Sequence, residues 1–122
     1  MSIICCTFAI LNNKIKNMEI TELQANEWIS SNEMPIVIDF FADWCSPCKA
    51  ISPFIEKLTN KYKDKALIGK LNVDDCTEIT STFTIRNIPT LLFIKNGEVV
   101  DRHVGGINEN ELNKKFENFI NT

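Results

Sequence analysis

A stretch in which a buried strand runs directly into a helix constrains the fold more than any other part of the chain. Residues 36–41 read Ile-Val-Ile-Asp-Phe-Phe and are apolar on both faces except at Asp39. Such runs are typical of central strands in parallel sheets that helices cover on both sides. From Cys45 the period changes, because apolar residues between Ile51 and Tyr62 recur at helical spacing. The sequence therefore predicts an α/β protein organised around this strand–turn–helix unit.

Strands and helices alternate along the rest of the chain. We expect an edge strand at 18–23, a short helix at 26–31, the strand at 36–41, a helix from Cys45 to Tyr62, a strand at 66–73, a short helix ending at Phe83, strands at 90–94 and 98–104, and a last helix that Asn108 caps. Asn96-Gly97 predicts a tight hairpin between the last two strands. The alternation implies parallel crossovers, so we expect a mixed sheet of about five strands flanked by about four helices.

The chain has 122 residues, enough for one domain. We expect this domain to span residues 18–122, with residues 1–17 as an N-terminal extension outside the fold. The apolar run at 3–11 is far shorter than the ~20 residues that cross a bilayer. It has neither a basic start nor an Ala-x-Ala-like cleavage site, so a signal peptide is disfavoured.

The net charge and the cysteine content limit which classes of partner and which cellular compartment the sequence favours. The net charge is −3, and no stripe of Lys and Arg alternates with aromatic residues, which argues against nucleic acid as a partner. The cysteines are odd in number and irregularly spread: Cys5, Cys6, Cys45, Cys48 and Cys76. Secreted disulfide frameworks are usually even in number and denser. We therefore expect a reducing compartment, the cytoplasm, and no membrane.

Cys45 and Cys48, spaced Cys-x-x-Cys, fall at the start of the predicted helix. Backbone N–H groups and the helix dipole favour a thiolate at this position. The helical geometry predicts an exposed, attacking Cys45 and a shielded, resolving Cys48 one turn deeper. Pro47 stiffens the first turn, where its missing N–H costs nothing. One thiolate that attacks and a second that resolves are what thiol–disulfide exchange needs.

A metal site is the other interpretation of this pair. Zinc needs four ligands. The remaining candidates are Cys5, Cys6, Cys76 and His103, and they form no second close pair outside the N-terminal extension. We therefore expect no metal.

Asp39 is the one carboxylate in the central strand, where burial should raise its pKa. Lys70 is the only charge in the neighbouring predicted strand and is its predicted partner. Asp39 could accept the proton of Cys48, through water, during resolution. The alternative is a structural ion pair, which would contribute little stability. Its position beside the cysteines favours the functional interpretation.

Several further motifs follow one another in the chain: residues 44–49 (Trp-Cys-Ser-Pro-Cys-Lys) after 38–40, then 70–74, 88–90 and 104–106 (Val-Gly-Gly). Through these motifs the chain resembles the thioredoxin family from about Met18 to its C-terminus. This resemblance implies the thioredoxin fold and a protein-disulfide reductase that takes part in cell redox homeostasis. Cys45 would be the nucleophile, Cys48 the resolving residue, and the two together the redox-active disulfide.

The same resemblance implies a substrate-contact surface around Cys45. It implies a cis peptide bond at Ile88–Pro89 and a backbone at Ile88 that pairs with the substrate chain. The residues placed at this surface are Trp44, Ser46, Pro47, Ile88, Pro89 and Gly105. Ser46 stands where glycine is commonest in the family, which leaves the redox potential open.

The resemblance also implies how the pair is recharged. No cofactor would be bound, and electrons would come from NADPH through a flavoprotein thioredoxin reductase. Clients would be proteins with disulfides, such as reductases and peroxiredoxins, and the protein would act as a monomer. An exported thiol-disulfide oxidant or isomerase, and a binding subunit that uses the same fold, are the alternatives.

Overall fold

The computed structural model describes residues 19–31 and 34–122, so the expected extension at 1–17 lies outside the described residues. The elements in chain order are α2 (Glu22–Ser31), β1 (Ile36–Phe41), α3 (Ser46–Lys61), β2 (Leu67–Asn72), α4 (Thr77–Thr82), β3 (Thr90–Lys95), β4 (Glu98–Val104) and α5 (Glu109–Asn121). The predicted mixed α/β architecture is confirmed, and the predicted bounds of the central strand are those of β1.

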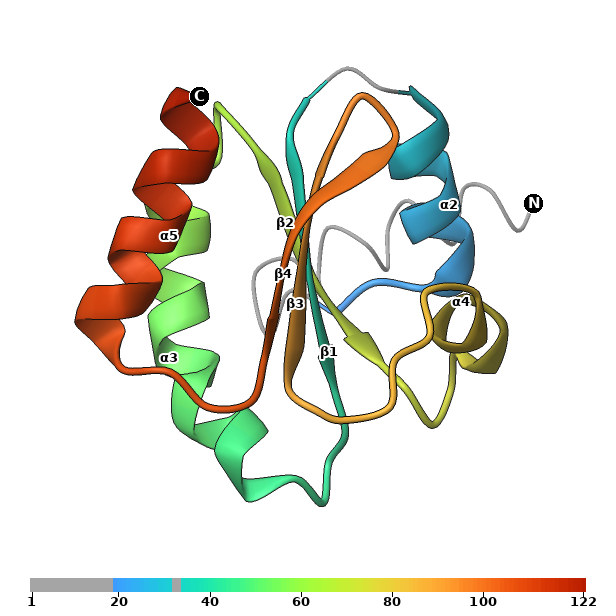
Figure 1. Cartoon of the computed structure of the whole chain (residues 1–122). Helices are drawn as coiled ribbons and strands as arrows, with labels where there is room; N and C mark the ends of the chain where they lie inside the picture. The colour runs from blue at the N-terminus through green and yellow to red at the C-terminus, as the bar shows by residue number, and fades with distance from the viewer. Residues whose placement is uncertain (1–18, 32–33) are drawn as a thin grey trace.

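A four-stranded sheet in the order β2-β1-β3-β4 forms the middle layer (Figure 1). β1 and β2 run parallel, whereas β3 is antiparallel to β1 and β4 is antiparallel to β3. Asn96 and Gly97 both have positive φ, as the predicted tight hairpin between β3 and β4 requires. The central position of β1 places Asp39 beside Lys70 of β2 in the strand register.

The expected fifth strand is reduced, within the described residues, to one bridge between Glu19 and Lys70. The reason is a capping box that starts α2 at Glu22 rather than at the predicted residue 26. The Thr21 hydroxyl accepts a hydrogen bond from the Gln24 N–H at 3.1 Å, and the Gln24 side chain accepts one from the Thr21 N–H at 2.8 Å. The Thr-x-x-Gln pattern at residues 21–24 is the sequence signal for this earlier helix start.

Helices cover both faces of the sheet, with α3 and α5 on one side and α2 and α4 on the other (Figure 1). The first face buries Val37 of β1 against α3 and α5. The opposite face buries Ile36, Ile38 and Phe40 of β1 with residues of α2 and α4. Because side chains alternate along a strand, Asp39 points to the same face as Val37, beneath α3.

Candidate active site

Cys45 and Cys48 form a disulfide at the junction between β1 and α3, and their Cα atoms are 5.3 Å apart. Cys45 is the N-cap of α3, with extended backbone angles (φ −94°, ψ 108°), and Pro47 lies in the first turn. The Cys48 N–H donates to the Cys45 sulfur at 3.2 Å. The Cys45 sulfur therefore occupies the position of a capping acceptor, where the helix end favours negative charge.

The expected exposure of Cys45 is not found in this disulfide form. Only 4% of Cys45 and 2% of Cys48 is exposed. Phe41 and Ala42, at the end of β1 and just after it, bury the pair, and further apolar cover comes from Val73 and Ile88. A helix end alone would leave Cys45 exposed, but segments distant in the sequence add apolar cover around it.

Trp44 is the large exposed side chain next to the disulfide, with 70% of its surface accessible. Its indole Nε1–H donates to Asp74 Oδ2 at 3.0 Å, which links the ring to the loop after β2. The Asp74 N–H in turn donates to the Asn72 side chain at 2.9 Å. Asp74 was not among the predicted site residues. The available signal was its position, because it lies just after β2, which runs parallel to the strand that leads into Trp44.

The loop before β3 forms a second wall of the site. The Ile88–Pro89 bond is cis, as the family resemblance implied. Ile88 packs against the apolar cluster that contains both cysteines. The Gly105 N–H donates to the Pro89 carbonyl at 2.8 Å, and Gly105 adopts the left-handed φ of +95°. The structure thus brings Ile88, Pro89 and Gly105 together beside the disulfide.

Asp39 is completely buried, and neither of its carboxylate oxygens has a hydrogen-bond partner within the described structure. Burial raises its pKa to about 7, although the positive charge of Lys70 lowers it in part. The predicted direct ion pair is not made. The Lys70 ammonium instead donates to Ser52 Oγ at 2.7 Å and lies 4.7 Å from the centre of the Phe41 ring. Strand register places the two residues together, but the flexible lysine side chain reaches another acceptor.

Within residues 19–31 and 34–122, no three His, Cys, Asp or Glu side chains gather as a metal site would need. No helix in that part of the chain is long and apolar enough to cross a membrane.

The family model for thioredoxin matches residues 16–118. The chain belongs to the thioredoxin family. A thioredoxin of Chlorobaculum thiosulfatiphilum is 41% identical over 105 residues, which are 86% of this chain and 97% of the relative. A thioredoxin of Haemophilus influenzae is 39% identical over 104 residues, or 85% and 94% of the two chains.

A chloroplastic M-type thioredoxin of Spinacia oleracea is 35% identical over 102 residues, 84% of this chain and 56% of that longer protein. Family membership and the Cys45–Cys48 disulfide together identify a protein-disulfide reductase, an oxidoreductase with a redox-active disulfide. Thioredoxins exchange electrons with redox partner proteins and normally bind no cofactor.

Proposed function

We propose that Cys45 is the nucleophile of this reductase and Cys48 its resolving thiol. The Cys45 thiolate attacks one sulfur of a protein disulfide, forms a mixed disulfide with it, and releases the other sulfur as a thiolate. Cys48 then loses its proton and attacks the Cys45 sulfur. The Cys45–Cys48 disulfide forms, and the second substrate thiolate leaves. Two electrons have passed from the dithiol to the substrate.

The observation that carries this assignment is the hydrogen bond from the Cys48 N–H to the Cys45 sulfur at the start of α3. In the reduced protein, a thiolate at Cys45 would accept the same bond and interact with the positive end of the helix dipole. Cys48 lies inside the first turns of α3 and would remain protonated until a base takes its proton.

We further propose that Asp39 is this base, with Lys70 as the cation that adjusts its basicity. Asp39 shares the α3 face with Phe41, which contacts the disulfide cluster. Its pKa of about 7 suits a group that must exchange a proton near neutral pH. Water would carry the proton between Cys48 and the carboxylate.

The substrate chain would lie on the surface formed by Trp44, Ser46, Pro47, Ile88, Pro89 and Gly105. The half-buried Ile88, which packs against the cysteines, and the exposed Trp44 offer apolar contacts beside the disulfide. The backbone at Ile88 would pair with an extended substrate segment.

We propose that NADPH reduces the disulfide through a flavoprotein thioredoxin reductase, and that a cytoplasmic monomer serves reductases and peroxiredoxins as clients. Supporting a reducing compartment, Cys76 is an unpaired, buried thiol within the described structure.

The test is a redox titration of the Cys45/Cys48 pair, combined with turnover of insulin disulfides by a thioredoxin reductase and NADPH. We expect Cys45→Ser to abolish turnover and Cys48→Ser to accumulate mixed disulfides. Full activity of the Cys45→Ser variant would contradict the mechanism. A potential near the −270 mV of thioredoxin supports a reductant, whereas about −120 to −180 mV would indicate an oxidant or isomerase.

A further inference from the structure

Ser52 lies in α3, between the disulfide and the middle of the helix, and bonds Lys70, the cation opposite Asp39 in the strand register. Its hydroxyl accepts a hydrogen bond from the Lys70 ammonium at 2.7 Å. The same ammonium lies over the Phe41 ring, 4.7 Å from its centre. Such a cation–π contact adds to the stability of this position. Lys70 is thus held by a neutral hydroxyl and an aromatic ring.

This arrangement leaves Asp39 without a counter-ion in contact. The ion pairs of the described residues are Lys57–Glu109 and Lys115–Asp101, and neither involves Asp39 or Lys70. Asp39 is opposite Lys70 in the register of β1 and β2, and both side chains point toward α3. A lysine side chain is long enough to serve either acceptor, and here the Lys70 ammonium bonds the Ser52 hydroxyl.

We propose that Ser52 is a positioning residue: its hydroxyl holds the Lys70 ammonium away from the Asp39 carboxylate and thereby preserves that carboxylate as the proton acceptor for Cys48. The inference rests on the proposed role of Asp39 and adds a residue that tunes it. An opposite charge within about 4–6 Å lowers a carboxyl pKa by roughly 1–3 units. A direct ion pair would therefore make Asp39 a weaker base for a thiol.

Few other groups can influence Asp39. On the face beneath α3, β2 contributes Lys70, and α3 contributes the two cysteines together with the uncharged Ser52. The residues of β3 and α5 in this core are apolar: Leu91, Phe93, Leu112, Phe116 and Phe119. Burial and Lys70 are accordingly the two causes that set the pKa of Asp39.

The experiment follows the Asp39 carboxyl by ¹³C NMR during a pH titration of full-length protein, in the oxidised and the reduced form. In Ser52→Ala the ammonium loses its hydroxyl acceptor, and we expect the pKa of Asp39 to fall by about one unit. Ser52→Thr keeps a hydroxyl at this position and should retain the wild-type pKa. In a Lys70→Met background, Ser52→Ala should shift nothing, because the cation is gone.

An unchanged or raised pKa in Ser52→Ala would overturn the proposal. So would an equal shift in the Lys70→Met background, since Ser52 would then act without Lys70. Single-turnover release of a peptide from the mixed disulfide gives the kinetic readout, and its pH midpoint should move down with the pKa. If Asp39→Asn leaves that pH dependence unchanged, the role of Asp39 as base fails, while the NMR titration still decides where Ser52 holds Lys70.

Discussion

The Arg102 guanidinium donates from Nη2 to the Phe83 backbone carbonyl at 2.8 Å and from Nη1 to the Thr84 carbonyl at 3.5 Å. Phe83 is the C-cap of α4, where unpaired carbonyls and the negative end of the helix dipole favour a cation. Arg102 thus joins the edge strand β4 to the start of the loop that leads to Ile88 and Pro89.

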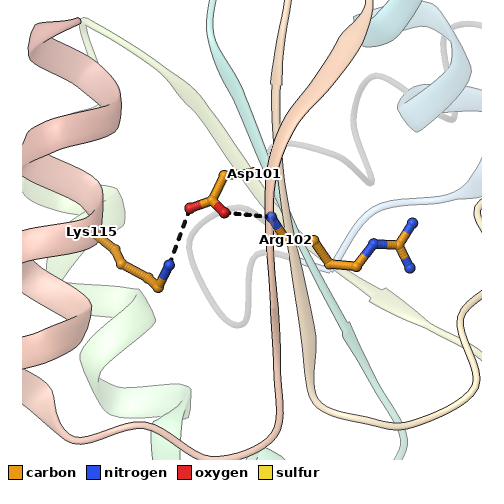
Figure 2. A network of polar contacts seen from close by, with 3 residues as sticks. All are labelled: Asp101, Arg102 and Lys115. Atoms are coloured by element: carbon orange, nitrogen blue, oxygen red, sulfur yellow. Dashed lines mark hydrogen bonds and ion pairs between the residues drawn. The ribbon is translucent and has the colours of Figure 1, made fainter.

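Asp101, the residue before Arg102 on β4, makes a polar contact with the helical layer on the other side of the sheet. Figure 2 shows the side chains of Asp101 and Arg102 extending in opposite directions from the strand, as alternation requires. Asp101 accepts from the Lys115 ammonium of α5 at 3.1 Å and from the Arg102 N–H at 2.8 Å (Figure 2). β4 is therefore attached to both helical layers.

Replacing Arg102 with Met should loosen the loop before β3 while leaving the cysteines in place. We expect the KM for a protein disulfide to rise several-fold, with little change in the reaction with a small disulfide reagent. Loss of hydrogen bonds from a charged donor should lower the free energy of unfolding by about 1 kcal/mol. Steady-state insulin reduction and urea unfolding measure the two effects.

Lys115→Met is the matched control, because it removes the other polar link from β4 without touching the Ile88 loop. The Lys115–Asp101 pair is partly exposed, and such pairs contribute about 0–1 kcal/mol. An equal rise in KM in both variants would show that Arg102 has no specific effect on the loop.

Asp39→Asn should remove the pH dependence that this buried carboxyl imposes on stability. The pKa of Asp39 rises from 3.8 to about 7 on folding, so the folded state binds its proton more tightly than the unfolded state does. Stability is therefore lost as the pH rises from about 4 to above 7, by roughly 4 kcal/mol when integrated over the shift. We expect the Asp39→Asn variant to be more stable than the wild type by a few kcal/mol at about pH 8.5, with the difference vanishing toward pH 4.

Urea unfolding of oxidised protein across this pH range measures the difference. Asp101→Asn provides the comparison, because that carboxylate is exposed on β4. A wild-type protein that gains stability relative to the Asp39→Asn variant between about pH 5 and 8 would contradict the raised pKa.

The strand register that places Asp39 beside Lys70 was accessible from the sequence, because each is the only charged residue in its strand. The order of elements after Met18 was accessible for a similar reason, since periodicity changes clearly from strand to helix. What could not be predicted was the acceptor that Lys70 reaches. That outcome depends on the helical phase of α3, which turns Ser52 toward β2. The walls around Cys45 likewise arise from segments distant in sequence.

Glu22 caps a helix to which it does not belong. Its carboxylate accepts a hydrogen bond from the Ile79 N–H at 2.6 Å, the third residue of α4, whose own N-cap, Cys76, makes no side-chain capping bond. Burial is the main cause that raises the pKa of the Cys76 thiol, and the negative charges of Glu22 and Asp75 raise it further. We expect Glu22→Ala to lower the free energy of unfolding by about 1 kcal/mol and to speed Cys76 alkylation in a Cys45→Ser/Cys48→Ser background. Glu27 is exposed on the same helix, and Glu27→Ala should change neither the free energy of unfolding nor the rate of Cys76 alkylation.

The absence of a side chain at Gly69 of β2 allows Ile20, just before α2, and Trp28 of α2 to pack closely against the strand. A Cβ at this position would lie 2.9 Å from Ile20 Cγ2 and 3.1 Å from a ring carbon of Trp28. The Ile20 backbone is held there because its N–H donates to the Lys70 carbonyl at 2.8 Å, so the backbone cannot shift away without breaking that bond. Overpacking of this kind typically costs about 1–3 kcal/mol, and we expect Gly69→Ala to lose that much stability in urea unfolding.

Gly106→Ala is the control for this prediction. A Cβ at Gly106 meets no atom within 4 Å, so the change should alter stability by less than about 0.5 kcal/mol. Adding Ile20→Val to Gly69→Ala removes the Ile20 Cδ1 methyl, which would lie 3.1 Å from the new Cβ, and should recover part of the loss. An additive further loss would locate the strain elsewhere.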